Sequence, residues 1–314
     1  MSDCRGNLAD VLNSSTPAES APAVPDLPVN EPAAPSETAL MAAACRAAHL
    51  IVDREPHIFA DTVAARLLGR RADELISYHR VHGDHVVLAG ARAQVTVRAA
   101  VTEARLADAV ERGTNQYVIL GAGLDTFAYR SPVAARIRVF EVDQPATQRW
   151  KRDRLAADGI EARGTVHYVP LDFEADALVP ALVAAGFDVT RPAFVSWLGV
   201  TMYLSGAAID GTLQTLGQLA PGSEIVADYM LPEGERDGAG ETYASMVAPV
   251  AAEHGEPWLS CLAPDDVTTR LAAAGFTEVE HVEQANAVDA ALWRRDDALR
   301  PARLSMLVHA TVAG

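Results

Sequence analysis

Lysine is almost missing from this chain, because Lys151 is the only one among 314 residues. The formal net charge is −16, and no stripe of basic residues is interleaved with aromatic residues. Proteins bind a phosphate backbone mainly through clustered lysine and arginine. The composition therefore disfavours nucleic acid as a partner, and the acidity mainly favours solubility.

Cysteines and long apolar runs are also scarce. Cys4, Cys45 and Cys261 are odd in number and widely spaced, which fits neither a disulfide framework nor a C-x-x-C metal site. No apolar run approaches the roughly 20 residues that span a bilayer. The first residues, MSDCRGNLAD, lack the basic and apolar regions of a secretory signal. We therefore expect no membrane partner and a reducing, cytoplasmic location.

The N-terminal third contains two different patterns. Residues 1–35 hold six prolines among alanine, serine and acidic residues, with no periodic apolar face, and predict a disordered tail. Ser36 can cap a first helix, residues 57–68 predict a second one, and Gln94–Arg112 predict a long one. Residues 36–113 are therefore expected to form a helical N-terminal region.

Strands and helices alternate through residues 114–314. Short apolar runs predict strands at 117–120, 138–142, 165–169, 193–197 and 224–228. The alternation indicates an α/β fold with a parallel, doubly wound sheet. Residues 231–258 interrupt it, and we interpret them as an insertion at the carboxyl ends of the strands, where such sheets bind ligands. The chain closes with two successive strands, which predicts an antiparallel edge strand.

The most informative motif is the run YVILGAGLDT, which is followed by VFEVDQP. Gly121 and Gly123 form a tight turn after a buried strand, and Asp143 lies twenty residues past Gly123. The glycines let the backbone approach a ligand, and the carboxylate can accept hydrogen bonds from ribose hydroxyls. Thr126 replaces the third glycine of the dinucleotide motif G-x-G-x-x-G. This pattern suits S-adenosylmethionine, which has no pyrophosphate, and disfavours a nicotinamide enzyme.

Taken together, these motifs resemble the leucine carboxyl methyltransferase family, in its bacterial branch of S-adenosylmethionine-dependent O-methyltransferases. The resemblance runs from about Thr38 to Thr311. Its carriers are VILGAGLDTFAYR, FEVDQPATQRWK, SWLGVTMYLSGAAIDGTL, PGSEIVADY and GEPWLSCLAPDDVTTRLAAAGF, with weaker support from Arg46-Ala47 and Phe59-Ala60-Asp61. It implies the Rossmann-like class I methyltransferase fold: a doubly wound, mostly parallel seven-stranded sheet, an antiparallel last strand and a lid of N-terminal helices.

The resemblance also implies which residues bind the nucleoside and the methionine part of the cofactor. Gly121, Ala122 and Gly123 leave space for the methionine part. Asp143 matches the family's ribose-binding acid, and Glu141, two residues earlier on the same strand face, is the alternate. Which of the two binds ribose stays open at this point.

Three further cofactor contacts follow from the resemblance. Asp172 and Phe173 match the adenine site, where a carboxylate accepts from the exocyclic amine and the ring packs on the base. Arg98 matches the arginine that holds the cofactor's carboxylate, a task that suits a guanidinium. Leu198 stands where many relatives carry an acid, which leaves it a backbone or packing contact. The alternates for the arginine are Arg92 and Arg105.

The expected reaction is methyl-ester formation on a carboxylate of a small molecule or peptide. A carboxylate is ionised at neutral pH and needs no base, so no catalytic residue is predicted. A phenol or alcohol would need one, and His57 or one histidine of the 79–85 cluster is then the candidate. Tyr203 could bind the substrate or fill the core, and Tyr229 is a further substrate candidate.

No metal is expected. His79, His82 and His85 follow an H-x-x-H-x-x-H spacing, but three-residue steps do not place all three on one helix face. Other functions stay open: a hydroxyl or nitrogen methyltransferase acting on a natural-product scaffold, or a cofactor-binding protein without catalysis.

Overall fold

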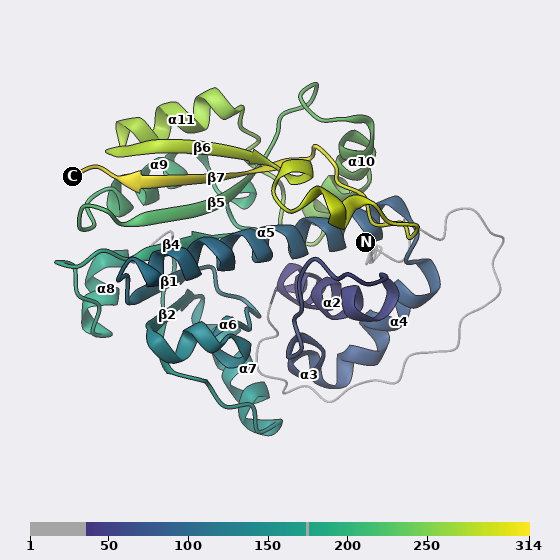
Figure 1. Cartoon of the computed structure of the whole chain (residues 1–314), viewed down its shortest axis with the longest axis horizontal. Helices are drawn as coiled ribbons and strands as arrows, with labels where there is room; N and C mark the ends of the chain where they lie inside the picture. Colours follow the sequence, from purple (N-terminus) through teal and green to yellow (C-terminus); the bar gives the residue numbers. More distant parts are fainter. Residues whose placement is uncertain (1–35, 174–175) are drawn as a thin grey trace, which may run out of the picture.

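The computed structural model describes residues 36–173 and 176–314, so the tail predicted at residues 1–35 lies outside the described part. Figure 1 shows a layered α/β arrangement with a group of helices beyond one end of the sheet. In chain order the main elements are α2 (Glu37–Val52), α3 (Ala64–Leu68), α4 (Ala72–His82), α5 (Val86–Glu111), β1 (Gln116–Leu120), α6 (Phe127–Arg130), β2 (Arg138–Asp143), α7 (Pro145–Ala157), β3 (Thr165–Pro170), α8 (Leu178–Ala184), β4 (Phe194–Trp197), η3 (Thr201–Tyr203), α9 (Gly206–Leu216), β5 (Glu224–Met230), α10 (Gly238–Glu253), α11 (Pro264–Ala273), β6 (Phe276–Glu283) and β7 (Ser305–Val312).

The seven strands form one sheet in the order β3-β2-β1-β4-β5-β7-β6. Strands β1 to β5 pair in parallel, which confirms the doubly wound α/β prediction. The last strand, β7, is antiparallel to both of its neighbours, β5 and β6. It lies inside the sheet, so the edge strand on this side is β6 and not the antiparallel β7. The sheet order reverses between β1 and β4, and ligands bind α/β sheets at such a switch point.

The two faces of the sheet build two separate apolar cores. On β1, Tyr117 and Ile119 pack with residues of α2 and α5, whereas Val118 and Leu120 pack with residues of α8, α9 and α11. Successive strand residues point to opposite faces, which explains why this strand is apolar throughout. Both faces are therefore covered, and only the ends of the strands remain for a ligand.

The N-terminal helices differ from the sequence prediction in where they begin. Ser36 caps α2 as expected, by accepting from the backbone N–H of Ala39. The segment before α3 is not helical, because the Asp61 carboxylate accepts from the amides of Val63 and Ala64 and holds them at the helix entrance. The long helix α5 begins at Val86, since the imidazole of His85 caps it. None of the helices in the described ranges is both long and apolar enough to cross a membrane.

A buried polar network ties α2, α4 and α5 together. Arg92 makes a bidentate ion pair with Asp53 at 2.8 Å, and Asp53 also bonds Nδ1 of His49 at 2.8 Å. His79 lies 3.3 Å from Arg92 through Nδ1 and 3.8 Å from the Cys45 sulfur through Nε2. Burial lowers the pKa of His79 to about 4, and Arg92 contributes to the shift. Burial also lowers the pKa of His49, against the opposing effect of Asp53.

This network predicts acid sensitivity of the fold. Free imidazole titrates near pH 6.5, so between about pH 6.5 and 4 the unfolded chain binds protons that buried His79 does not. The free energy of unfolding should therefore be highest above that window and fall as the pH decreases through it, by about 3 kcal/mol for His79. Urea unfolding at stepped pH measures the loss.

The matched variants are His79→Gln and His82→Gln, because His82 lies exposed on the same helix. The loss between pH 6.5 and 4 should become smaller in His79→Gln and stay unchanged in His82→Gln. Equal pH profiles for the wild type and both variants would contradict the assignment to His79.

Candidate functional site

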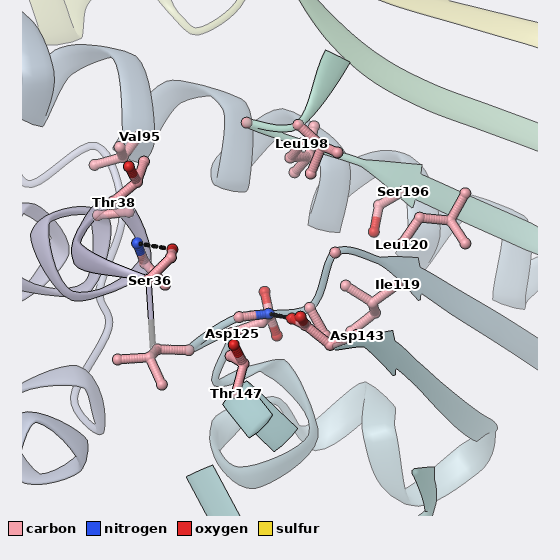
Figure 2. Close-up of a pocket in the computed structure, with 18 of the residues that line it drawn as sticks. Ser36, Thr38, Val95, Ile119, Leu120, Asp125, Asp143, Thr147, Ser196 and Leu198 are labelled. Atoms are coloured by element: carbon pink, nitrogen blue, oxygen red, sulfur yellow. Dashed lines mark hydrogen bonds between the residues drawn. The ribbon is translucent and has the colours of Figure 1, made fainter. Parts of the chain in front are cut away.

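A cavity of about 280 Å³ lies at the carboxyl ends of β1, β2 and β4, between the sheet and helix α2. Figure 2 shows Asp143, Ile119 and Leu120 on the sheet side of this cavity, with Ser36, Thr38 and Val95 on the opposite side. The cavity therefore lies at the position where the strand order reverses, as expected from the glycine motif.

The loop after β1 forms one wall of the cavity with its backbone. Gly121 has φ +67°, and a Cβ there would approach Val200 Cγ2 to 2.5 Å. Its amide and that of Ala122 donate to the carbonyl of Val142 at 2.9 and 3.0 Å, which fixes the loop to β2. Only glycine tolerates this conformation and this approach together. The result is an open backbone cradle that a side chain would fill.

Asp143 closes the end of β2 and lines the same cavity. Its carboxylate accepts from the amide of Gly123 and, at 2.6 Å, from the amide of Gln144. Burial raises the pKa of Asp143, while these two amides act in the opposite direction. The carboxylate can accept further hydrogen bonds, so its position and chemistry fit a pair of ribose hydroxyls.

Glu141 has a different environment, although it precedes Asp143 by only two residues. It is 1 % exposed, does not line the cavity, and bonds Lys151 Nζ at 2.7 Å. Burial raises the pKa of Glu141, and Lys151 opposes the shift. The single lysine of the chain thus neutralises a buried carboxylate between β2 and α7. Of the two acids left open by the sequence, Asp143 is the one at the cavity.

Of the three candidate arginines, Arg98 on α5 is the one that lines the cavity. Its Nη1 bonds Asp228 at 2.9 Å, and the other oxygen of Asp228 accepts from the amide of Gly199 at 2.6 Å. Gly199 has φ +72°, and a Cβ there would lie 2.6 Å from Arg98 Nη2. The two alternates lie elsewhere: Arg92 belongs to the buried Asp53 network, and Arg105 pairs with Glu280.

The buried carboxylate of Asp61 connects helix α2 to the glycine loop. It bonds Arg46 Nε at 2.8 Å and the hydroxyl of Thr126 at 2.7 Å, and Arg46 also donates to the carbonyl of Leu124 at 2.7 Å. Although burial would raise the pKa of Asp61, Arg46 and Arg130 hold it below its ordinary value. Both arginines line the cavity.

The remaining predicted residues divide into two groups. Phe173, Leu198 and Tyr203 line the cavity together with the residues described above. Asp172, His57 and Tyr229 do not line it. His57 contacts the carbonyl of Asp53, and the Tyr229 hydroxyl bonds His281 at 2.8 Å within the other core.

None of the histidines of the 79–85 cluster lines the cavity. His79 belongs to the Arg92 network, and His85 caps α5. Within residues 36–173 and 176–314, no group of three or more histidine, cysteine, aspartate and glutamate residues is arranged to hold a metal ion.

Several residues that line the cavity have no role predicted from the sequence. The polar ones are Thr38, Arg46, Asp125, Arg130, Gln144, Thr147, Ser196 and Glu256. All of them except Thr38 lie in runs that carry the family resemblance, and that was the only available signal. Glu256, in the loop between α10 and α11, comes from the insertion whose path the sequence did not define.

The comparisons with known proteins agree with this geometry. Residues 39–217 match the family model described as leucine carboxyl methyltransferase. The chain is 31 % identical over 297 residues to YktD of Bacillus subtilis, which is named as an S-adenosyl-L-methionine-dependent methyltransferase; the match covers 88 % of this chain and 97 % of YktD. A protein of Mycobacteroides abscessus with the same type of name is 34 % identical over 263 residues, or 81 % of this chain and 84 % of that protein.

Two solved structures share the fold at low sequence identity. A methyltransferase-type structure from Thermobifida fusca aligns with a TM-score of 0.54 and 20 % identity, covering 89 % of this chain and 96 % of that one. A DUF574 family protein from Streptomyces avermitilis aligns with a TM-score of 0.53 and 18 % identity, covering 86 % of this chain and 97 % of that one. They support the class I methyltransferase fold.

If Asp143 holds the ribose, Asp143→Asn should weaken binding of S-adenosylhomocysteine by about 10- to 100-fold, because a hydrogen bond to a charged group contributes roughly 1.5–3 kcal/mol. Isothermal titration calorimetry measures the dissociation constant. Asp172→Asn, next to the cavity-lining Phe173, tests the adenine prediction in the same assay. Unchanged affinity of Asp143→Asn would show that the nucleoside binds elsewhere.

Glu141→Gln should act on stability and not on binding. It leaves the Lys151 ammonium buried without an anion, which typically costs about 3–5 kcal/mol. Urea unfolding should show this loss, and the double variant Glu141→Leu, Lys151→Met should recover most of it. A stable Glu141→Gln variant with lost affinity for S-adenosylhomocysteine would instead make Glu141 the ribose ligand.

Proposed function

Since this chain belongs to the leucine carboxyl methyltransferase family and is an S-adenosylmethionine-dependent methyltransferase, we propose that it methylates a carboxylate oxygen of a small molecule or peptide. The product is a methyl ester. The proposal rests on the family and on one property of the cavity, which is that its carboxylates already accept hydrogen bonds from other groups of the protein.

The cavity offers little that could deprotonate an acceptor. No histidine, cysteine or lysine is among the described residues that line it. Its carboxylates accept hydrogen bonds from the protein: Asp125 from the amide of Phe127, Asp143 from two amides, and Glu256 from the hydroxyl of Thr38. A carboxylate acceptor needs no base, because it is ionised at neutral pH. This match favours ester formation over methylation of a hydroxyl or amine.

The residues of the cavity divide the binding tasks in this proposal. Asp143 holds the ribose hydroxyls, Phe173 packs on the adenine, and Arg98 pairs with the carboxylate of the methionine part. The glycine loop, through Gly121 and Gly123, leaves room for the backbone of that part. The bound cofactor supplies an electrophilic methyl group on a sulfonium.

The chain then acts mainly by alignment. Leu198 and Val200 line the cavity beside Arg98 and provide an apolar wall that excludes water. Burial raises the pKa of Tyr203, so its hydroxyl stays protonated and can donate to the acceptor. Positioning of this kind lowers the barrier because it removes the entropy cost of bringing two reactants together.

Ester formation is tested by incubating the protein with methyl-labelled S-adenosylmethionine and a panel of small carboxylic acids and peptides. The transferred label should be released as methanol by mild base, since esters hydrolyse there and ethers or methylamines do not. Asp143→Asn should lower the rate at subsaturating cofactor. Transfer of label into a product that resists base would contradict the carboxylate assignment.

A further inference from the structure

The cavity has two chemically different ends. The end at the sheet carries Asp143 and the glycine loop, which suit the nucleoside. The opposite end is formed by Thr38 at the start of α2, Val95 on α5, Tyr203 in η3 and Glu256 between α10 and α11. Figure 2 shows Thr38 and Val95 across the cavity from Asp143. We call this opposite end the distal end, and it is where an acceptor has room.

The distal end carries a carboxylate without a cation. Each arginine that lines the cavity already has a carboxylate partner: the pairs are Arg46 with Asp61, Arg98 with Asp228, and Arg130 with Glu103. Glu256 accepts a hydrogen bond from the Thr38 hydroxyl and has no ion-pair partner in the described part of the chain. It is half-buried. The distal end is therefore net negative.

The described residues around Glu256 carry no positive charge that could pair with its carboxylate. Tyr203 is a neutral phenol, Val95 is apolar, and Trp258 belongs to the apolar cluster with Met202. Withdrawing a carboxylate from water is costly unless a cation or several donors compensate for it. The Thr38 hydroxyl supplies one donor and fixes the orientation of the carboxylate, which leaves its other lone pairs for a ligand.

We propose that Glu256 recognises a protonated amine of the acceptor. The acceptor is then an amino acid or a similar zwitterion, with the reacting carboxylate toward the methyl donor and the ammonium group at the distal end. This assignment rests on the proposed carboxylate methylation for the reacting group, and on the charge of the distal end for the amine. It makes Glu256 a specificity-determining residue.

The alternative partner for Glu256 is the amino group of the cofactor's own methionine part. A binding experiment distinguishes the two partners. S-adenosylhomocysteine carries the amine of the cofactor, whereas the amine of the acceptor is present only when the acceptor is added. Glu256→Gln suits this test, since an amide oxygen can still accept from Thr38 while the charge is lost. Glu253→Gln is the matched control, because Glu253 is exposed at the end of α10 and does not line the cavity.

The experiment uses acid pairs that differ only in a terminal amine. The probes are γ-aminobutanoate, δ-aminopentanoate and ε-aminohexanoate, each compared with the plain acid of equal length. Each is titrated into the complex of the protein with S-adenosylhomocysteine and then offered as acceptor with S-adenosylmethionine. The series varies the spacing between carboxylate and ammonium.

At the best spacing, the amino acid should bind at least about tenfold more tightly than its plain acid in the wild type and in Glu253→Gln. The preference should disappear in Glu256→Gln, while the affinity for S-adenosylhomocysteine stays unchanged. The proposal is overturned if no spacing gives a preference, if Glu256→Gln keeps it, or if that variant loses affinity for S-adenosylhomocysteine itself.

The acceptor assay separates this inference from the proposed function. An amine preference in binding without base-labile product would leave the recognition by Glu256 standing and refute ester formation. Base-labile product formed equally from both members of each pair would support ester formation and refute the role of Glu256.

Discussion

The carboxylate of Asp143 holds the loop that leaves β1, and the candidate site depends on this contact. The loop has positive φ angles at Gly121 and Gly123, which favour glycine, and a Cβ at Gly121 would lie 2.5 Å from Val200 Cγ2. Two of its amides bond the end of β2, and a third, from Gly123, bonds Asp143 itself. The acid therefore has two tasks, since it fixes the shape of the cradle and presents its remaining lone pairs to a ligand. An alanine at position 121 would both strain the backbone and fill the space.

The N-terminal helices are as necessary to the cavity as the sheet. Asp61 and Arg46 connect α2 to the glycine loop, and Asp228 of β5 connects Arg98 on α5 to Gly199 in the loop after β4. Because these contacts join helices α2 and α5 to the sheet and its loops, the cavity forms only when the helices are packed on the sheet. The buried network around Arg92 and Asp53 stabilises that packing.

Features that depend on local sequence were predictable, and those that depend on tertiary contacts were not. The strands, the parallel sheet and the Gly121–Gly123 turn follow from apolar runs and glycine spacing, and they were confirmed. The start of α5 was missed, because Gly90 argues against a helix locally while its lack of a side chain lets Tyr243 pack there. The antiparallel β7 was expected, but its place between β5 and β6 follows from pairing that a sequence does not display.

The same distinction applies to the site. Glu141 and Asp143 share a strand face and could not be separated by spacing. In the structure Lys151 pairs with Glu141, whereas Asp143 lines the cavity. Glu256 lies more than a hundred residues from Asp143, and although the run GEPW that contains it carries the family resemblance, that run alone does not indicate that Glu256 reaches the cavity. A crystal structure with S-adenosylhomocysteine tests the central claim most directly. The account predicts the ribose hydroxyls on Asp143 and the adenine against Phe173, whereas a nucleoside bound away from the β1 loop would contradict it.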